Sequence, residues 1–464
     1  MDFNQNSSYD TLLEKWDPLL SHESIPSIHD SYKKKVTAVL LENQEVALRQ
    51  QYISEANTMG GNFQAGQVGS AGNLAGYDPI LISLVRRSMP NLMAYDIAGV
   101  QPMSAPTGLI FAMRSRYEGT TLGKEALFQE AFAQYSGSGN TSSGFSAPNG
   151  AATAASQGID PTLATGSGIR GNTFSMANFR GLLTSEGESL TNTGTKIFKE
   201  MGFSIERIAV EAKTRALKAE YTTELAQDLK AVHGLDAESE LANILSTEIL
   251  NEINRELMYT LYRVAKTGAT SSDLDAYSSG GGVYDLNTDS DGRWSAERFR
   301  GLMFQIERES NVIAKETRRG KGNFIVCSSD VASALAMGGF LNVSPALNVQ
   351  LEVDDTGNTF AGILNGKFKV YIDPYTKTDA NFCMVGYRGA SPYDAGVFYC
   401  PYVPLQMVRA VDQNSFQPKI GFKTRYGMVA NPFADSTSID VVGQNQYYRI
   451  FQVKNLHGNT GFGL

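Results

Sequence analysis

The clearest pattern in the chain is a run of apolar residues at three- and four-residue steps between Ser204 and Val232. At about 100° per residue such positions share helix faces, so the run predicts one helix of about 43 Å, with Ser204 as its N-cap and Gly234 just beyond its end. Its later apolar positions lie opposite its earlier ones, so we expect a spine helix between two packing layers. The two stripes are Ile205, Ile208, Ala209, Ala212, Ala216 and Ala219, and then Leu217, Tyr221, Leu225, Leu229 and Val232.

A second helix is predicted directly after the first, from Asp236 onward. Its apolar residues repeat every four positions with glutamates interleaved, so one face of it is apolar. We expect this second helix to pack against the first. The repeating positions are Leu241, Leu245, Ile249, Ile253, Leu257 and Leu261.

Shorter patterns elsewhere predict strands. An apolar run from Leu109 to Met113 is followed by alternation through Tyr117, which predicts one arm of a β-hairpin. Between residues 320 and 420, a strand, a turn and a helix are followed by further strands, which indicates a mixed domain; together with the long helices it places the chain in the α+β class. These elements are Phe324–Cys327, Val331–Met337, Phe368–Ile372 and Val397–Cys400.

Two segments lack the pattern of a packed core. Residues 136–159 contain no charged residue and are rich in small and polar ones, so they predict a long surface segment, which composition alone would identify as a flexible linker. Near the N-terminus, a helix predicted from Ser31 to about Ser54 is followed by a glycine-rich stretch. Residues 1–55 carry five basic against nine acidic residues, a net charge of −4, which is half of the −8 of the whole chain.

Composition narrows the class of function. The chain has 464 residues and 40 Lys and Arg against 48 Asp and Glu, and this acidic balance argues against a dedicated DNA-binding protein. Cys327, Cys383 and Cys400 form no CxxC pair and predict buried, reduced thiols. There is neither a signal-peptide pattern nor an apolar run of membrane-spanning length, so we expect the protein to be made in the cytoplasm.

No catalytic or metal-binding motif stands out. No two of the four histidines stand at metal-ligand spacing, and the HExxH, GxSxG and GxxxxGK[ST] patterns are absent. The segment from Asn287 begins like a calcium loop, but Arg298 occupies the position of the bidentate glutamate, so Asx-turns before a Ser295-capped helix are the better interpretation. We therefore expect no metal, no cofactor and no catalytic residue.

Four blocks of the chain, together and in this order, resemble the major capsid proteins of T-even-type tailed phages: residues 108–119, 204–268, 389–405 and 420–433. The resemblance implies a Hong Kong 97-like (HK97-like) capsid fold with a long spine helix, an extended β-hairpin loop that reaches over a neighbouring subunit, and an insertion domain. It further implies a leader at 1–55, an N-terminal arm at 56–100, the extended loop with its insertion domain at 101–195, a peripheral domain with the spine helix at 196–319, an axial domain at 320–419 and a return to the peripheral domain at 420–464.

The resemblance also implies that the leader is removed by proteolysis. Proteases of such phages prefer Leu or Ile, then any residue, then Glu, and Ile53-Ser54-Glu55 followed by Ala56 fits that rule. We favour Glu55 as the boundary because the predicted helix gives way to glycine there, where a protease can reach extended backbone. An ordinary helix-to-loop junction is the alternative. Three competing triplets end at Glu14, Glu42 and Glu252.

In function, the resemblance implies a structural shell protein. Such a protein would assemble into hexameric capsomers of an icosahedral or prolate head that encloses double-stranded DNA. Its implied partners are a vertex capsid protein, a portal, a scaffold core, a prohead protease and a host chaperonin with a phage co-chaperone, and binding of decoration proteins is left open. The alternatives are the paralogous pentameric vertex protein, an encapsulin-like nanocompartment shell and a soluble hydrolase.

Overall fold

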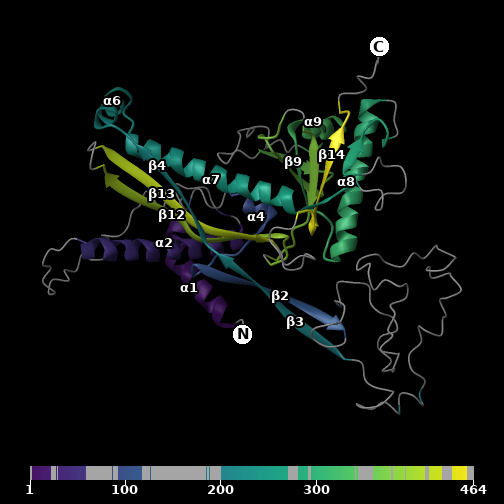
Figure 1. Cartoon of the computed structure of the whole chain (residues 1–464), viewed down its shortest axis with the longest axis horizontal. Coiled ribbons are helices and arrows are strands. Elements are labelled where there is room, and N and C mark those ends of the chain that lie inside the picture. The colour runs from purple at the N-terminus through teal and green to yellow at the C-terminus, as the bar shows by residue number, and fades with distance from the viewer. Residues whose placement is uncertain are drawn as a thin grey trace.

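In the computed structural model, the chain forms two sheets, a separate β-hairpin and helices that join them (Figure 1). Among the described helices, none combines the length and the hydropathy that a membrane span requires. The structure describes residues 3–21, 28, 30–58, 86, 92–117, 126, 184, 188, 200–269, 281–290, 294–339, 341–342, 359–377, 380–391, 393–412, 417–430 and 442–456.

The first sheet is built on two long antiparallel strands, which pair from Val397 and Ala430 at one end to Val411 and Pro418 at the other. A third strand joins the outer edge of the second long strand in antiparallel pairing, and a short strand runs parallel to the first long strand. The order is β1 (Gly99–Val100), β12 (Val397–Val411), β13 (Pro418–Ala430) and β4 (Lys213–Glu220).

The second sheet has eight strands and is covered by helices α8 (Ser295–Thr317) and α9 (Ser329–Met337). All four residues of its strand β7 are buried, as expected for a strand with both faces covered. The order is β5 (Ala265–Thr267), β14 (Asn445–Lys454), β11 (Phe382–Gly386), β7 (Phe324–Cys327), β10 (Phe368–Ile372), β9 (Thr359–Leu364) and β8 (Leu341–Asn342), and β6 (Val283–Asp285) also pairs with β14.

One long helix, α7 (Ala237–Val264), connects the two sheets. In Figure 1 it runs along the long strands of the first sheet and ends beside the second, and it contacts β4, β13 and β14. Its buried face follows the predicted four-residue repeat, with Leu245, Ile249 and Leu257 among its buried positions. The second predicted helix is therefore confirmed, and it takes the place of the spine.

The prediction of one helix over residues 204–232 is wrong. This segment forms strand β3 (Met201–Glu211), strand β4 and the shorter helix α6 (Thr223–His233). In β4, half-buried Arg215 and Leu217 alternate with exposed residues, which is the period of a strand. Local residues such as alanine and lysine favour a helix, but antiparallel pairing with β13 over the whole of β4 overrides that preference.

The ends of the helices agree only in part with the prediction. Gly234 ends α6 with a left-handed φ of 67°, as predicted, but Thr222 is the N-cap. At the start of α2 (Ser31–Thr58) the carboxylate of Asp30, not the predicted Ser31, accepts the backbone N–H of Tyr32 at 2.9 Å. Trp294 precedes α8 where a Ser295 cap was expected.

The strands predicted at Phe324–Cys327 and Phe368–Ile372 are confirmed with the same bounds, and the one predicted at Val397–Cys400 is the start of the longer β12. The predicted helix at Val331–Met337 is part of α9. The predicted surface segment 136–159 lies outside the described residues.

Two helices of the N-terminal segment pack into the largest hydrophobic cluster. These are α1 (Phe3–Leu20) and α2, which contact each other, and α2 also contacts β12. The cluster joins them to the buried face of α7, to α4 (Ala94–Ile97) and to both sheets. From the N-terminal segment the cluster takes Trp16, Leu20, Ile28, Val36, Ala38, Leu40 and Leu41.

Candidate interaction and processing surfaces

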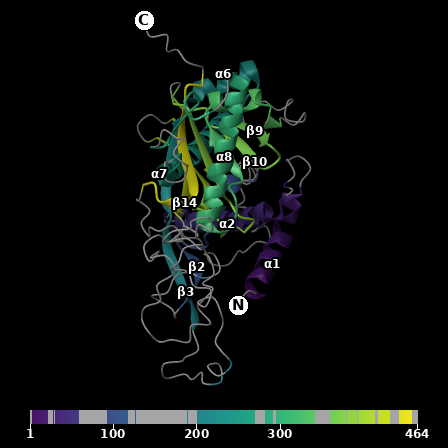
Figure 2. The ribbon, with the colours of Figure 1, turned by 90° about the vertical axis from the view of Figure 1, so that its right-hand side faces the viewer.

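The β-hairpin is the most projecting feature of the described chain. Strand β2 (Thr107–Tyr117) confirms the predicted arm, and its partner is β3, with an unbroken register from Thr107 opposite Glu211 to Tyr117 opposite Met201. At about 3.4 Å per residue, 11-residue strands reach about 35 Å. Figures 1 and 2 both show the hairpin extending away from the two sheets.

One face of this hairpin exposes five large apolar side chains. Residues directly opposite each other in an antiparallel pair share a face, and the register places every second residue of both strands on this one. Soluble monomers rarely expose a large contiguous apolar patch, so this face is a candidate protein-interaction surface, which we call the hairpin face. Its exposed side chains are Leu109 (45%), Phe111 (60%), Met201 (55%), Phe203 (61%) and Ile205 (63%).

The opposite face anchors the base of the hairpin to the first sheet. Ile110 and Val210 are 2% and 1% exposed and belong to a small cluster with residues of β12 and β13. Gly427 of β13 permits this approach, because a Cβ there would lie only 2.5 Å from the Cγ1 of Val210. The hairpin is therefore fixed at its base while its apolar face stays open.

The N-terminal segment is held against the body by polar contacts as well as by its apolar side chains. The Nδ2 of Asn43 donates to the carbonyl oxygens of Met103 at 2.8 Å and of Tyr402 at 3.0 Å, and the hydroxyl of Tyr32 donates to the carbonyl of Val100. These acceptors are backbone atoms of β1, of β12 and of the segment that follows β1. The bonds therefore fix the position of α2 along β12.

The two helices of this segment are also joined to each other. The Nζ of Lys15 lies 2.6 Å from the Oε2 of Glu42 and 2.7 Å from the Oε2 of Glu45, and the Nε1 of Trp16 donates to Glu42 at 3.2 Å. Such partly exposed ion pairs contribute little energy each. Their effect is to set the register of α1 on α2.

The predicted processing residues Ile53, Glu55 and Ala56 lie in the last two turns of α2. The helix continues to Thr58, beyond the predicted end near Ser54, so the bond after Glu55 is helical here and not extended as expected. Helix ends fray, and a protease reaches a bond at a helix terminus more easily than one in mid-helix. The side chains of these residues are outside the described set.

The competing triplets have clearer environments. Leu40 and Leu41 are 0% and 1% exposed and Glu42 is ion-paired, so the triplet that ends at Glu42 is packed into the core. Glu252 lies in the middle of α7 and pairs with Arg215. Glu14 is an exposed residue within α1, in the middle of that helix.

Helix α7 is bound to the first sheet by a charged cluster. Arg215 of β4 donates to the Oε2 of Glu252 at 3.0 Å and to the Oε2 of Glu256 at 2.6 Å, and the hydroxyl of Tyr426 also bonds to Glu256. Tyr426 in turn packs against the buried ring of Tyr399. These contacts explain why the arginine faces inward from a half-buried strand.

The other side of α7 is bound to the second sheet through Asp373. The carboxylate of Asp373 is fully buried and accepts from the Nη1 of Arg255 at 2.8 and 2.7 Å and from the hydroxyl of Tyr262 at 2.7 Å. The guanidinium of Arg255 also lies over the rings of Tyr259 and Tyr375. Burial and the neighbouring carboxylate raise the pKa of Tyr262, which keeps its hydroxyl a donor.

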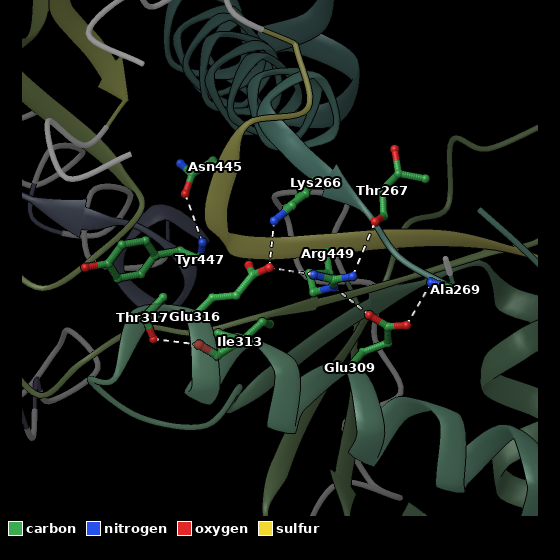
Figure 3. A network of polar contacts seen from close by, with 10 residues as sticks. All are labelled: Lys266, Thr267, Ala269, Glu309, Ile313, Glu316, Thr317, Asn445, Tyr447 and Arg449. Carbon is green, nitrogen blue, oxygen red and sulfur yellow. Dashed lines mark hydrogen bonds and ion pairs between the residues drawn. The ribbon is translucent and has the colours of Figure 1, made fainter. Parts of the chain in front are cut away.

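Beyond the C-terminal end of α7, a buried network joins the second sheet to α8 (Figure 3). Arg449 of β14 is 0% exposed; its Nε bonds to the Oε2 of Glu309 at 2.6 Å and its Nη1 to the Oε1 of Glu316 at 3.3 Å. Glu309 accepts the N–H of Ala269 at 2.8 Å, and Lys266 pairs with Glu316. Each charge has a partner of opposite sign, as buried charges require, so the network is structural.

The described residues hold no group of three or more His, Cys, Asp or Glu side chains placed to bind a metal. In the rejected calcium loop, Asp289 accepts the backbone N–H of Asp285 and Asn287 accepts from the guanidinium of Arg298, so these oxygens are engaged in turn contacts. The three cysteines are free and buried, which confirms that prediction.

Similarity to known proteins shows the family to which this chain belongs. A family model described as "Major capsid protein Gp23" matches residues 74–453. The chain belongs to the Gp23 major capsid protein family. It is 36% identical to the major capsid protein of Enterobacteria phage T4, a match that covers 96% of this chain and 98% of the relative. The same identity holds for the major capsid protein of Vibrio phage KVP40, over 96% of this chain and all of the relative.

As a Gp23-family major capsid protein, the chain is a structural component of a phage head and is located in the virion. The capsid vertex protein of phage T4 is 31% identical but matches only 50% of this chain and 53% of its own length, which favours the major over the vertex assignment. Among solved structures, the capsid of Myoviridae phage XM1 covers 78% of this chain and 92% of its own, with a TM-score of 0.37 and 7% identity.

Proposed function

We propose that this chain assembles into hexameric capsomers that form an HK97-like head shell around double-stranded DNA, and that it acts without catalysis. The domain boundaries expected from the sequence belong to this proposal, with a peripheral domain at 196–319 and 420–464 and an axial domain at 320–419. A vertex capsid protein, a portal, a scaffold core, a prohead protease and a chaperonin would be its partners.

The observation that carries the proposal is the hairpin face, which we assign to contact with a second copy of the chain. Five large apolar side chains are 45–63% exposed on one face of an arm anchored at its base. If this face packs on a different surface of the second copy, the contact is heterologous, and heterologous contacts form a ring when the rotation between copies closes. Burial of this face would supply part of the assembly energy.

The hairpin face can be tested with the double variant Phe203→Asp/Ile205→Asp. Because both side chains are exposed in the subunit, we expect its unfolding temperature to stay within about 2 °C of the wild type. In the contact, however, two buried charges would be unpaired, so we expect assembly to fail. Negative-stain electron microscopy of chain co-expressed with chaperonin would show six-fold rings, tubes or shells only for the wild type.

Arg207→Ser, on the same strand and the same face, is the matched control and should assemble normally. Normal shells from the double variant would refute the assignment of the hairpin face. Five-fold rings from the wild type would instead favour the vertex-protein alternative, and a persistent monomer would reopen the encapsulin and hydrolase alternatives.

We further propose that the segment up to Glu55 is a leader that is cut off after assembly begins. Support comes from the position of Glu55 at the end of α2, whereas the triplets at Glu42 and Glu252 are held within packed helices. Glu14 lies inside the leader, so a cut there would not define the mature boundary.

The variant Glu55→Ala should keep residues 1–55 on the shell protein and leave heads immature and empty, while early assembly continues. Mass spectrometry of the N-terminus of head protein in infected cells, with electron microscopy of the same heads, measures both effects. Glu14→Ala is the control and should be processed normally at Glu55. Full-sized, DNA-filled heads with uncut Glu55→Ala protein would show that this cleavage is not required.

A further inference from the structure

The leader helices are an integral part of the subunit core in this structure. Leu40 and Leu41 of α2 are almost fully buried, and Asn43 and Tyr32 bond to backbone carbonyls of the body. Cutting one peptide bond after Glu55 leaves all of these contacts in place. A leader that is to depart must therefore have a docked state of limited strength.

One residue on the docked face of α2 limits that strength. Gln44 is 0% exposed and lies on the same helix face as Leu40 and Leu41, yet neither its Oε1 nor its Nε2 has a hydrogen-bond partner in the described part of the chain. Thr37, on the same face and equally buried, shows the contrast, because its hydroxyl donates to the carbonyl of Lys33 at 2.6 Å. An unsatisfied buried amide weakens its contact by roughly five- to 100-fold.

We propose that Gln44 is a release residue: it weakens docking enough for the leader to dissociate once it is cut, but not enough to undock it while it is part of the chain. This inference rests on the proposed cleavage after Glu55. While tethered, the leader faces its own docking surface at an effective concentration on the order of millimolar, so even a weak contact is occupied. After cleavage the same contact is bimolecular, and the weakening due to Gln44 then favours departure.

Gln44→Met tests this directly, because methionine has nearly the same length and no polar atoms that need a partner. In the purified, uncut, full-length chain we expect amide hydrogen exchange in α2 to slow by roughly tenfold relative to the wild type. Lys34→Met, at an exposed position of the same helix, should leave exchange unchanged. Gln44→Leu provides a second apolar variant in case the thioether packs poorly.

In heads from infected cells, Gln44→Met should be cut after Glu55 as in the wild type but should retain several-fold more of the 1–55 fragment, measured by mass spectrometry. Exchange in α2 that is unchanged or faster in both apolar variants would overturn the inference, as would equal loss of the fragment. Uncut chain in wild-type heads would instead refute the proposed cleavage, whereas the exchange data would still report on docking.

Discussion

At the scale of single residues, the interior of this subunit contains many ionisable groups that carry no charge. Burial raises the pKa of the Cys327 and Cys400 thiols to about 12 and that of Cys383 well above its ordinary value. Burial likewise raises the pKa of Tyr399 and Tyr448, which are fully enclosed. Buried thiols could be predicted from the sequence because isolated cysteines are usually core residues, whereas buried tyrosines depend on which strands come together.

These shifts predict that the subunit becomes unstable in alkali. Each group has a higher pKa in the folded than in the unfolded chain, so above about pH 9 the unfolded chain binds fewer protons and the free energy of unfolding falls as pH rises. Below that pH these groups do not make the free energy of unfolding depend on pH. Thermal unfolding followed at pH 8, 9, 10 and 11 should show a steepening decrease in midpoint, and a flat profile up to pH 11 would contradict it.

At the scale of elements, the prediction succeeded where the pattern was unambiguous and failed where two periods overlapped. The four-residue repeat of α7 and the short apolar run of β7 were correctly predicted. In β3, however, Met201, Phe203 and Ile205 also alternate with smaller or polar residues, a two-residue period that would have indicated the strand and its apolar face. Pairing with β2, some 90 residues away, decides between the helical period and the strand period. No local pattern in the sequence shows that pairing.

The joint between α7 and the second sheet gives a prediction at the same scale. Arg255→Ala removes the cation that partners the fully buried carboxylate of Asp373, so we expect the free energy of unfolding to fall by about 3–4 kcal/mol. Glu248→Ala, at an exposed position of the same helix, should change it by less than about 0.5 kcal/mol. Chemical unfolding measures both. Equal effects of the two variants would mean that the contact between Arg255 and Asp373 does not hold α7 to the second sheet.

At the scale of the whole molecule, residues 1–55, which form the proposed leader, share one hydrophobic cluster with the rest of the chain, and this cluster reaches from α1 to both sheets. The sequence indicated an acidic N-terminal segment with one helix from Ser31, and the resemblance implied that residues 1–55 are a leader, whereas helix α1 was not predicted. Their burial against β12 was not, because a helix with a short apolar stripe can pack on its own subunit or on a neighbour with the same pattern. The candidate cut at Glu55 could be proposed from the sequence because its triplet is a local pattern, whereas the docking of α2 on β12 depends on contacts between distant segments and could not.

Because residues 1–55 contribute to this hydrophobic core, residues 56–464 alone would have an incomplete core in the unassembled subunit. A chain of residues 56–464 expressed alone would leave the partners of Leu40, Leu41 and Val36 open to water, at roughly 2 kcal/mol for each lost side chain. We expect it to unfold at a lower temperature than the full-length chain, or to aggregate, when both are compared as subunits by differential scanning calorimetry. Adding a peptide of residues 1–55 in excess should restore part of the difference, because it refills the same site. If the shortened chain unfolds at the same temperature as the full-length one, the leader does not contribute to the core; if it is less stable alone yet stable within a cut shell, neighbouring subunits cover the face that the leader leaves.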